Sequence, residues 1–204
     1  MPKQQGPVTV WSQYLAARLG AAALTSFDVA ANPRAAGQLG QGLFDLDRRH
    51  RERACQHLRL AMPHWSEQRV EAVAGASFEH LVKLAVEVCS TPRVLTEDTW
   101  PARVKLGELG PALRLLNSDQ PVILLTGHVG NWEVLGYLLA VLGYELDAIA
   151  RPIDNPLIND WLLGIRQRQG MRIITKFDAT DRMVEVLDRG GALGFIADQN
   201  AGDK

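Results

Sequence analysis

Hydrophobic positions recur at helical spacing through the first half of the chain. Apolar residues three and four positions apart predict a helix over about 35–61, with Pro63 as its stop signal. Ser66 is suited to cap a second helix, and apolar positions from Val70 to Val88 mark one face of it. We expect this long helix to end before Pro92. The first half therefore predicts a helical scaffold.

From residue 119 the pattern changes to short aliphatic runs that alternate with amphipathic segments. This alternation is typical of successive βαβ units and of a largely parallel sheet. A glycine follows each predicted helix as a stop signal, at Gly143, Gly170 and Gly190. The predicted strands are Val122–Thr126, Leu146–Ala150, Arg172–Thr175 and Leu193–Ala197, and the predicted helices are Trp132–Leu142, Pro156–Gln169 and Thr180–Arg189. The sequence thus predicts an α/β fold with a right-handed, doubly wound core behind a helical N-terminal region.

The length of the chain favours one domain. Its 204 residues can bury a sizeable core but are few for two independent cores. Hydrophobic residues make up 47% and charged residues 22%, as in globular proteins. We predict a single domain over 1–204, with a mainly helical part over 1–118 and a βαβ core over 119–204.

Charge and hydropathy argue against nucleic acid as a partner and against a membrane-spanning or secretory segment. Lys and Arg number 22 against 23 Asp and Glu, so no net basic field attracts nucleic acid. The apolar stretch Tyr14–Phe27 contains Arg18 and is shorter than the about 20 residues that span a bilayer. It also lacks the features of a secretory signal. We therefore predict a protein on the cytoplasmic side whose two cysteines, Cys55 and Cys89, are free thiols.

One segment of the helical half is strongly basic, from Arg48 to Arg53. A solvated helix face is one interpretation, and contact with an anionic membrane surface is the other. Asp45 and Asp47 precede this segment and are interpreted as a helix-start feature rather than as a metal-binding pair.

Polar residues follow each predicted strand. In doubly wound sheets, ligands bind beyond the carboxyl ends of the strands. There the sequence has Gly127–Glu133 after the first strand, Arg151 after the second, Lys176 after the third, and Asp198 with Gln199 after the fourth. Together they supply a base, carboxylates and cations, and we expect them to form one site.

His128 and Glu133 are the candidate catalytic pair. On one continuous helix, five positions would separate them by about 140°. Gly127 and Gly130 allow a tight turn and Asn131 is suited to cap the following helix, so the two side chains could meet. A carboxylate on one imidazole nitrogen strengthens the other as a base. The alternative is that both residues only stabilise the turn.

Other chemistries lack their sequence signatures. The chain contains no G-x-S-x-G elbow, no G-x-x-x-x-G-K-[ST] phosphate loop, no H-E-x-x-H pair and no G-x-G-x-x-G fingerprint. Hydrolase, NTPase, zinc-protease and dehydrogenase functions therefore lose support.

The block Ile123–Glu133, with its sequence ILLTGHVGNWE, resembles the signature of the bacterial lipid A biosynthesis acyltransferases, the lauroyl and myristoyl transferases. The similarity extends in order along most of the chain. It includes Leu58–Pro63, Ser77–Leu81, Arg151–Leu157 and Ala197–Asn200. Several blocks in order carry more weight than one motif.

This resemblance implies transfer of a fatty acyl group from an acyl carrier protein thioester to a hydroxyl of a lipid A precursor. The reaction would take place at the cytoplasmic face of the inner membrane, with no cofactor besides the acyl-thioester co-substrate (acyl carrier protein or acyl-CoA) and no metal. His128 would be the general base and Glu133 would orient its imidazole.

The resemblance also implies substrate-binding residues. Arg151 would hold a phosphate of the donor's phosphopantetheine arm or of the lipid head group. Asp198 and Gln199 match the family's D-Q block, either binding substrate or bracing the loop. The remaining expected substrate-binding residues are Gly127, Gly130 and Asn131 in the loop of the signature block.

Two departures from the family pattern lead to further expectations. Relatives carry an N-terminal membrane anchor, whereas Arg18 interrupts the apolar stretch here, so we expect peripheral attachment. Relatives also continue beyond the position of Lys204, so we expect a truncated core.

Two alternative functions stay open. One is an acyl-CoA-dependent acyltransferase for a phosphatidylinositol mannoside type of glycolipid, and the other is a catalytically inert lipid-binding module.

Overall fold

A computed structural model describes residues 6–26, 32–175 and 179–199. The chain divides into two compact units. The first takes in the described residues of Met1–Ala17 and Thr91–Lys204, and the second is Arg18–Ser90. No helix among the described residues has the length and hydropathy needed to cross a bilayer.

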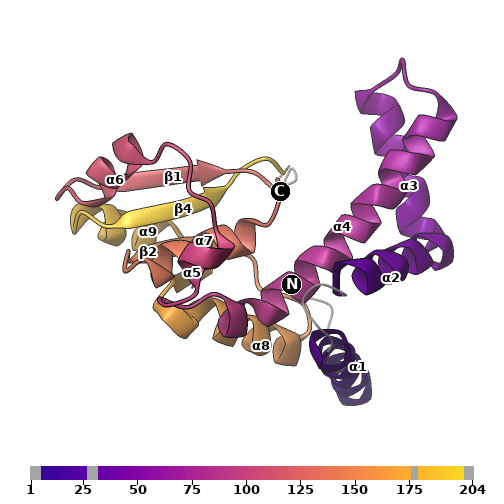
Figure 1. Cartoon of the computed structure of the whole chain (residues 1–204), viewed down its shortest axis with the longest axis horizontal. Helices are drawn as coiled ribbons and strands as arrows, with labels where there is room; N and C mark the ends of the chain where they lie inside the picture. The colour runs from indigo at the N-terminus through magenta and orange to yellow at the C-terminus, as the bar shows by residue number, and fades with distance from the viewer. Residues whose placement is uncertain (1–5, 27–31, 176–178, 200–204) are drawn as a thin grey trace. The chain divides into compact units, whose positions relative to one another are not determined.

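The second unit is helical. It contains α2 (Asn32–Leu46), α3 (Arg48–Ala61), most of α4 (Glu67–Val94) and the later part of α1 (Pro7–Ser26), as Figure 1 shows. The single helix predicted over 35–61 is wrong, because the chain breaks at Asp47. The Asp47 side chain accepts a hydrogen bond from the backbone N–H of His50 at 3.1 Å and so caps α3.

Close packing of α2 against α4 builds the core of this unit. A Cβ added at Gly40 would lie 2.4 Å from the Cα of Glu79, so only glycine fits there. Cys55 is buried in the adjoining apolar cluster, and it and Cys89 are free, as predicted. Burial raises the pKa of the Cys89 thiol.

Helix α4 does not end before Pro92, as the sequence predicted, but continues through it to Val94. The backbone N–H of Leu95 bonds to the carbonyl of Thr91 at 2.9 Å, so helical hydrogen bonding resumes after the proline. The predicted start is confirmed, because the Ser66 hydroxyl accepts from the N–H of Arg69.

The first unit contains a four-stranded parallel sheet in the order β1-β4-β2-β3. The strands are β1 (Val122–Thr126), β2 (Leu146–Ala150), β3 (Arg172–Thr175) and β4 (Ala192–Ile196). This sheet confirms the predicted α/β class and all four predicted strands, with β4 beginning one residue early.

Three helices of this unit match the prediction closely, namely α7 (Trp132–Val141), α8 (Pro156–Arg166) and α9 (Ala179–Asp188), with a 3-10 turn, η1 (Gln167–Gln169), completing the predicted end of α8. Two shorter helices, α5 (Trp100–Arg103) and α6 (Gly110–Leu116), were not predicted individually. Gly143, Gly170 and Gly190 have φ of 88°, 95° and 72°, so the predicted stop signals are left-handed turns.

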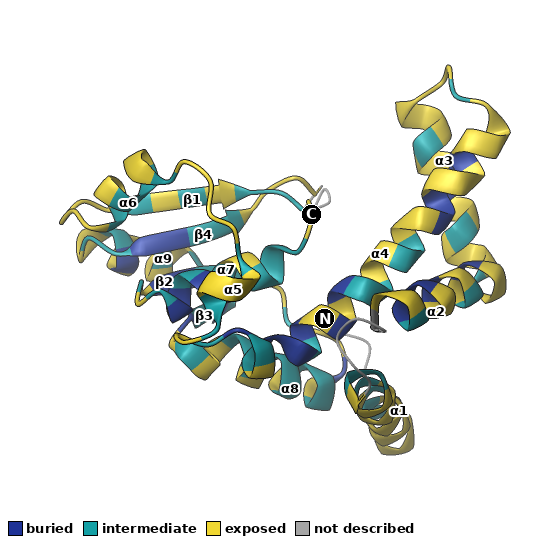
Figure 2. Cartoon of the chain, viewed as in Figure 1, coloured by how far each residue is buried: buried dark blue, intermediate teal, exposed yellow. Residues whose placement is uncertain are grey.

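Helices cover both faces of the sheet. Ala140 of α7 packs with Leu146 and Ala192 on one face, and Val186 of α9 packs with Ile174 and Leu193 on the other. Figure 2 shows the buried positions concentrated along β4 and β2. The core therefore lies in the two layers between the helices and the central strands.

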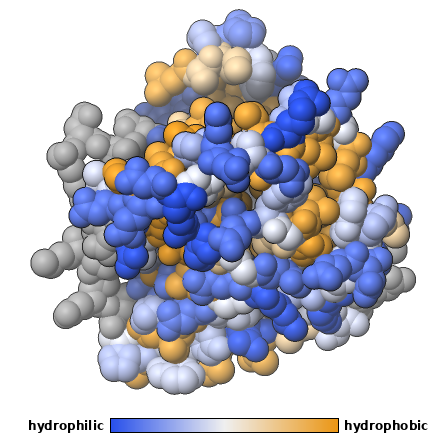
Figure 3. Space-filling model, turned by 90° about the vertical axis from the view of Figure 1, so that its left-hand side faces the viewer, coloured by the Kyte–Doolittle hydropathy of each residue, from blue (hydrophilic) through white to orange (hydrophobic). Residues whose placement is uncertain are grey.

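Strand β1 is an edge of the described sheet and keeps apolar surface exposed. Ile123 and Leu125 are 58% and 72% exposed. Figure 3 views the molecule from the side at which α6 lies in Figure 1, and it shows apolar surface interspersed with charged and polar side chains.

Candidate active site

The loop between β1 and α7 has the tight turn that the sequence predicted. Gly130 has a φ of 62°, a conformation that favours glycine. The Asn131 side chain accepts a hydrogen bond from the N–H of Val134 at 3.2 Å and caps α7. His128 therefore lies in the loop, and Glu133 lies in the first turn of the helix.

The partner of His128 is Asp198. The Nδ1 atom of His128 lies 2.6 Å from Oδ1 of Asp198, and the backbone N–H of His128 donates to Oδ2 at 2.7 Å. A Cβ at Gly127 would lie 3.0 Å from that Oδ2, so glycine leaves the space that the carboxylate occupies. The two residues are 70 positions apart in sequence and meet because β4 pairs with β1.

Glu133 has a different partner from the predicted one. Its carboxylate accepts a hydrogen bond from Nε of Arg166 at 2.7 Å and a second from Nη2 of the same guanidinium. The two side chains are only 14% and 17% exposed. The expected contact between His128 and Glu133 is therefore replaced by two separate pairs, because the first turn of α7 directs Glu133 toward α8.

The His128–Asp198 pair fixes the orientation of the imidazole. The hydrogen bonds from the side chain and backbone of His128 lower the pKa of Asp198 below its ordinary value of 3.8, so its carboxylate is ionised at neutral pH. Because Nδ1 faces this carboxylate, Nε2 lies on the opposite side of the ring. Among the residues that the structure describes, Nε2 has no hydrogen-bonding partner. It is thus available to accept a proton.

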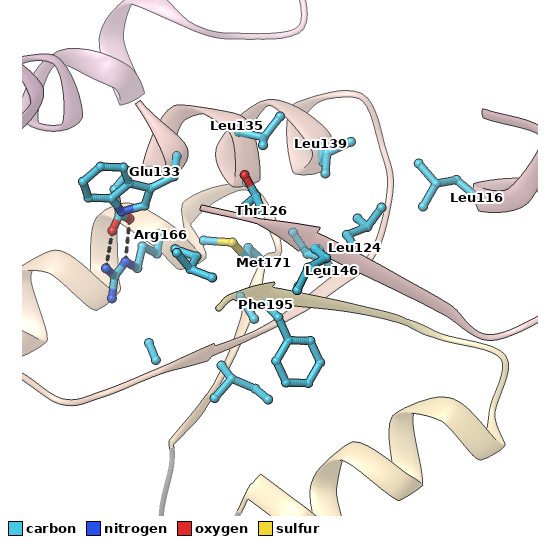
Figure 4. A pocket seen from close by; sticks show the side chains of 18 of the residues that line it. Leu116, Leu124, Thr126, Glu133, Leu135, Leu139, Leu146, Arg166, Met171 and Phe195 are labelled. Carbon is cyan, nitrogen blue, oxygen red and sulfur yellow. Dashed lines mark hydrogen bonds and ion pairs between the residues drawn. The ribbon is translucent and has the colours of Figure 1, made fainter. Parts of the chain in front are cut away.

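A cavity of about 300 Å³ lies next to this pair, between the sheet and helices α6 and α7. Its lining is mainly leucine, isoleucine and other apolar residues. Thr126, Glu133 and Arg166 are polar exceptions, and Figure 4 shows the Glu133–Arg166 ion pair at one end of the cavity. This combination suits a long apolar ligand with a polar end.

Two glycines in the cavity lining allow close packing of α7 and β4 against neighbouring side chains. A Cβ at Gly136 in α7 would lie 3.1 Å from Sδ of Met171, and one at Gly194 in β4 would lie 3.4 Å from Cδ1 of Leu146. Glycine inside a helix or a strand costs about 0.5–1 kcal/mol relative to alanine. Larger side chains here would fill the layer between α7 and the sheet.

Trp132 connects the pair to the cavity. It lines the cavity, and its ring packs edge-on against the imidazole of His128, with centroids 4.5 Å apart and an interplanar angle of 71°. A reactive group at the end of a ligand in the cavity would therefore lie near the imidazole.

The other predicted site residues lie outside this cavity. Arg151 is 72% exposed, with Asp154 at 3.8 Å, and Gln199 is exposed beside Asp198. Lys176 falls outside the described residues. The described part of the chain has no cluster of His, Cys, Asp and Glu suited to a metal.

Sequence reasoning missed Arg166 and Trp132 as site residues. Arg166 lies in the last turn of a predicted amphipathic helix, where a basic residue is ordinary. Trp132 belongs to the signature block, but its contact with the imidazole depends on how the loop turns back. Neither local pattern contains a signal for these contacts.

The arrangement can perform general base chemistry. An oriented imidazole next to an apolar cavity can remove a proton from a hydroxyl while an apolar substrate is held nearby. The Glu133–Arg166 pair fixes the start of α7, which carries Trp132, against the end of α8.

Comparison with known proteins identifies the family of the chain. The family described as bacterial lipid A biosynthesis acyltransferase matches residues 8–204. A curated lipid A biosynthesis acyltransferase of Haemophilus influenzae is 23% identical over 167 residues, which cover 81% of this chain and 52% of the relative. The chain thus spans about half the length of that relative. Because the family match covers nearly the whole chain, this protein belongs to the bacterial lipid A biosynthesis acyltransferase family.

Proposed function

We propose that this protein transfers a fatty acyl group from a carrier thioester to a hydroxyl of a lipid A precursor. The observation that carries the proposal is the His128–Asp198 pair, which lies beside an apolar cavity and leaves Nε2 without a hydrogen-bonding partner among the described residues. Family membership supports the reaction class. Acyl carrier protein is the proposed donor partner.

In the proposed mechanism, His128 Nε2 removes the proton of the acceptor hydroxyl as its oxygen attacks the thioester carbonyl. The tetrahedral intermediate then collapses with release of the donor thiolate. The imidazolium returns its proton to that thiolate, so atoms and charge balance without a covalent enzyme intermediate or a cofactor. Asp198 stabilises the imidazolium and fixes the ring, which is the role that sequence reasoning gave to Glu133.

The cavity supports the acyl chain as the transferred group. An apolar chain that fills it would be removed from water, which contributes about 0.8 kcal/mol per buried methylene. Trp132 lies between the imidazole and the cavity and would hold the thioester end near Nε2.

Exposed residues at the carboxyl ends of the strands would bind the polar parts of the substrates. Arg151 is the proposed contact for a phosphate, since its guanidinium is mostly solvent-accessible and its carboxylate neighbour lies at 3.8 Å. Gly127 and Gly130 lie within two positions of His128 in the chain, and Gln199 directly follows its partner Asp198. Gln199 and the backbone of the two glycines are proposed to line the acceptor path.

Attachment to the cytoplasmic face of the inner membrane is also proposed. Helix α1 exposes an apolar stripe at Val8, Trp11, Leu15 and Leu19, which are 51–82% exposed. A helix with such a stripe can lie in the lipid interface without crossing the bilayer.

The test is acyl transfer from labelled acyl carrier protein to a tetra-acylated lipid A precursor. We expect His128→Gln to reduce the rate by about 10²- to 10⁴-fold and Asp198→Asn by about 10- to 10³-fold. The matched controls are His57→Gln and Asp188→Asn, which change exposed residues of the same types that do not line the cavity. Both controls should keep the parent rate.

Two results would redirect the proposal. Transfer only to glycolipid acceptors from acyl-CoA would favour the phosphatidylinositol mannoside type of activity. Lipid binding without transfer, unaffected by His128→Gln, would favour an inert lipid-binding module. Transfer that survives His128→Gln at the parent rate would refute the mechanism.

A further inference from the structure

The apolar cavity has two chemically different ends. Thr126, Trp132 and Glu133 lie at the carboxyl end of β1, next to His128. The opposite end is formed by α6, whose Leu116 packs with the first residues of β2 and β4. Figure 4 shows Glu133 and Leu116 on opposite sides of the cavity.

One face of α6 closes this second end. The cavity-lining positions at the helix are three, four and seven residues apart, so they share a face. They are Leu109, Ala112, Leu113 and Leu116. Leu115 lies on the other side of the helix and is 53% exposed.

The end of α6 is tied to the rest of the unit. Asn117 directly follows the helix, and its Nδ2 donates to the hydroxyl of Tyr144 at 3.0 Å. The same Nδ2 donates to the carbonyl of Leu113 at 2.7 Å. These bonds hold the inner face of α6 at a fixed place relative to the loop that leads into β2.

We propose that the inner face of α6 sets the length of the acyl chain that the protein accepts. This inference rests on the proposed acyl transfer. The five-residue strand β1 is about 16 Å long, and it separates the reacting end of the cavity from α6. An extended chain with its carbonyl near His128 would run along β1 and end against α6.

Substitutions at two positions on this face should change the longest accepted acyl chain in opposite directions. Ala112 is the smallest of the lining side chains on α6, so a phenylalanine there would fill space at the cavity end. Leu116→Ala would remove a side chain that now closes this end. Because burial of one methylene changes affinity about fourfold, a change of two methylenes should alter selectivity about 15-fold.

The experiment compares the parent chain, Ala112→Phe, Leu116→Ala and the outward-facing control Leu115→Ala. Binding of saturated fatty acids of increasing length is measured by calorimetry, and transfer is measured with acyl carrier protein thioesters of the same lengths. We expect Ala112→Phe to shift both preferences to shorter chains and Leu116→Ala to longer chains. Leu115→Ala should keep the parent profile. A loss of folding cannot produce opposite shifts.

The outcomes separate this inference from the proposed function. Opposite shifts in binding without any transfer would support the length limit and overturn the transferase proposal. Transfer with one chain-length profile in all four proteins would overturn the length limit and leave the transferase proposal intact. If no fatty acid binds and no thioester reacts, both are overturned.

Discussion

Two clusters of charged residues lie at opposite ends of the sheet and differ in how their groups are used. At the amino end, Asp147 of β2 is 4% exposed and accepts hydrogen bonds from Arg172 and Arg189. At the carboxyl end, Asp198 binds one imidazole and is 43% exposed.

The difference shows why a charged cluster is not by itself a site. Two guanidinium groups surround the Asp147 carboxylate, and the pairing raises the pKa of Arg172. The ion pairs of that cluster hold β2, β3 and the end of α9 together. In the other cluster, the pairing uses one ring nitrogen of His128 and leaves the second without a partner among the described residues, and an apolar cavity lies next to the pair.

The largest expected effect is a loss of stability when the charged cluster at the amino end of the sheet is broken. Asp147→Asn would leave two guanidinium groups facing a neutral amide in a buried position. We expect the free energy of unfolding in urea to fall by about 2–3 kcal/mol, because Arg172 and Arg189 are half exposed and water screens part of the loss. Asp198→Asn at neutral pH should change stability much less. Equal losses in the two variants would abolish the distinction between the clusters.

A smaller effect is expected at the Glu133–Arg166 pair. Glu133→Gln would leave a largely buried guanidinium without its charged partner, at a cost of about 1–2 kcal/mol. In a double-mutant cycle, adding Arg166→Met to Glu133→Gln should restore part of the lost stability and part of any lost transfer rate. If Glu133 instead acted through His128, Glu133→Gln would slow transfer equally with and without Arg166.

The smallest expected effect is the pH dependence of stability from Asp198. Its lowered native pKa means that the carboxylate favours the folded state above the ordinary value of 3.8. That contribution is lost as the pH falls through the lowered pKa. The stability advantage of the parent over Asp198→Asn should therefore shrink as the pH falls from about 5 through the lowered pKa, as measured by urea unfolding at each pH. Parallel curves over the whole range would contradict this assignment.

Local sequence patterns predicted most of the fold. The strands from Val122 and Leu146 and the caps at Ser66 and Asn131 depend on neighbouring residues, so they could be read directly. The passage of α4 through Pro92 was missed. The helix start at Asp47 depends on the local cap that its own side chain makes, but the apolar pattern over 35–61 did not indicate that the helix breaks there.

The site was harder to predict because its partners are distant in sequence. The pattern placed His128 and Asp198 at strand ends but could not indicate that β4 lies beside β1. Glu133 is five positions from His128, so the local spacing predicts it as the partner. Instead, the neighbouring strand brings a carboxylate from 70 positions away to His128, and Glu133 forms an ion pair with Arg166.

The strand order has a consequence for how the protein folds during synthesis. Strand β4 is made after β1, β2 and β3, yet it lies between β1 and β2 in the sheet. Until residue 196 has left the ribosome, β1 has no neighbour to pair with among the strands described here. Such long-range pairing forms slowly, since a long loop must close before its contacts stabilise it. The imidazole and its carboxylate therefore come together only when β4 joins the other described strands, and a chain interrupted before that point would contain the histidine without its partner.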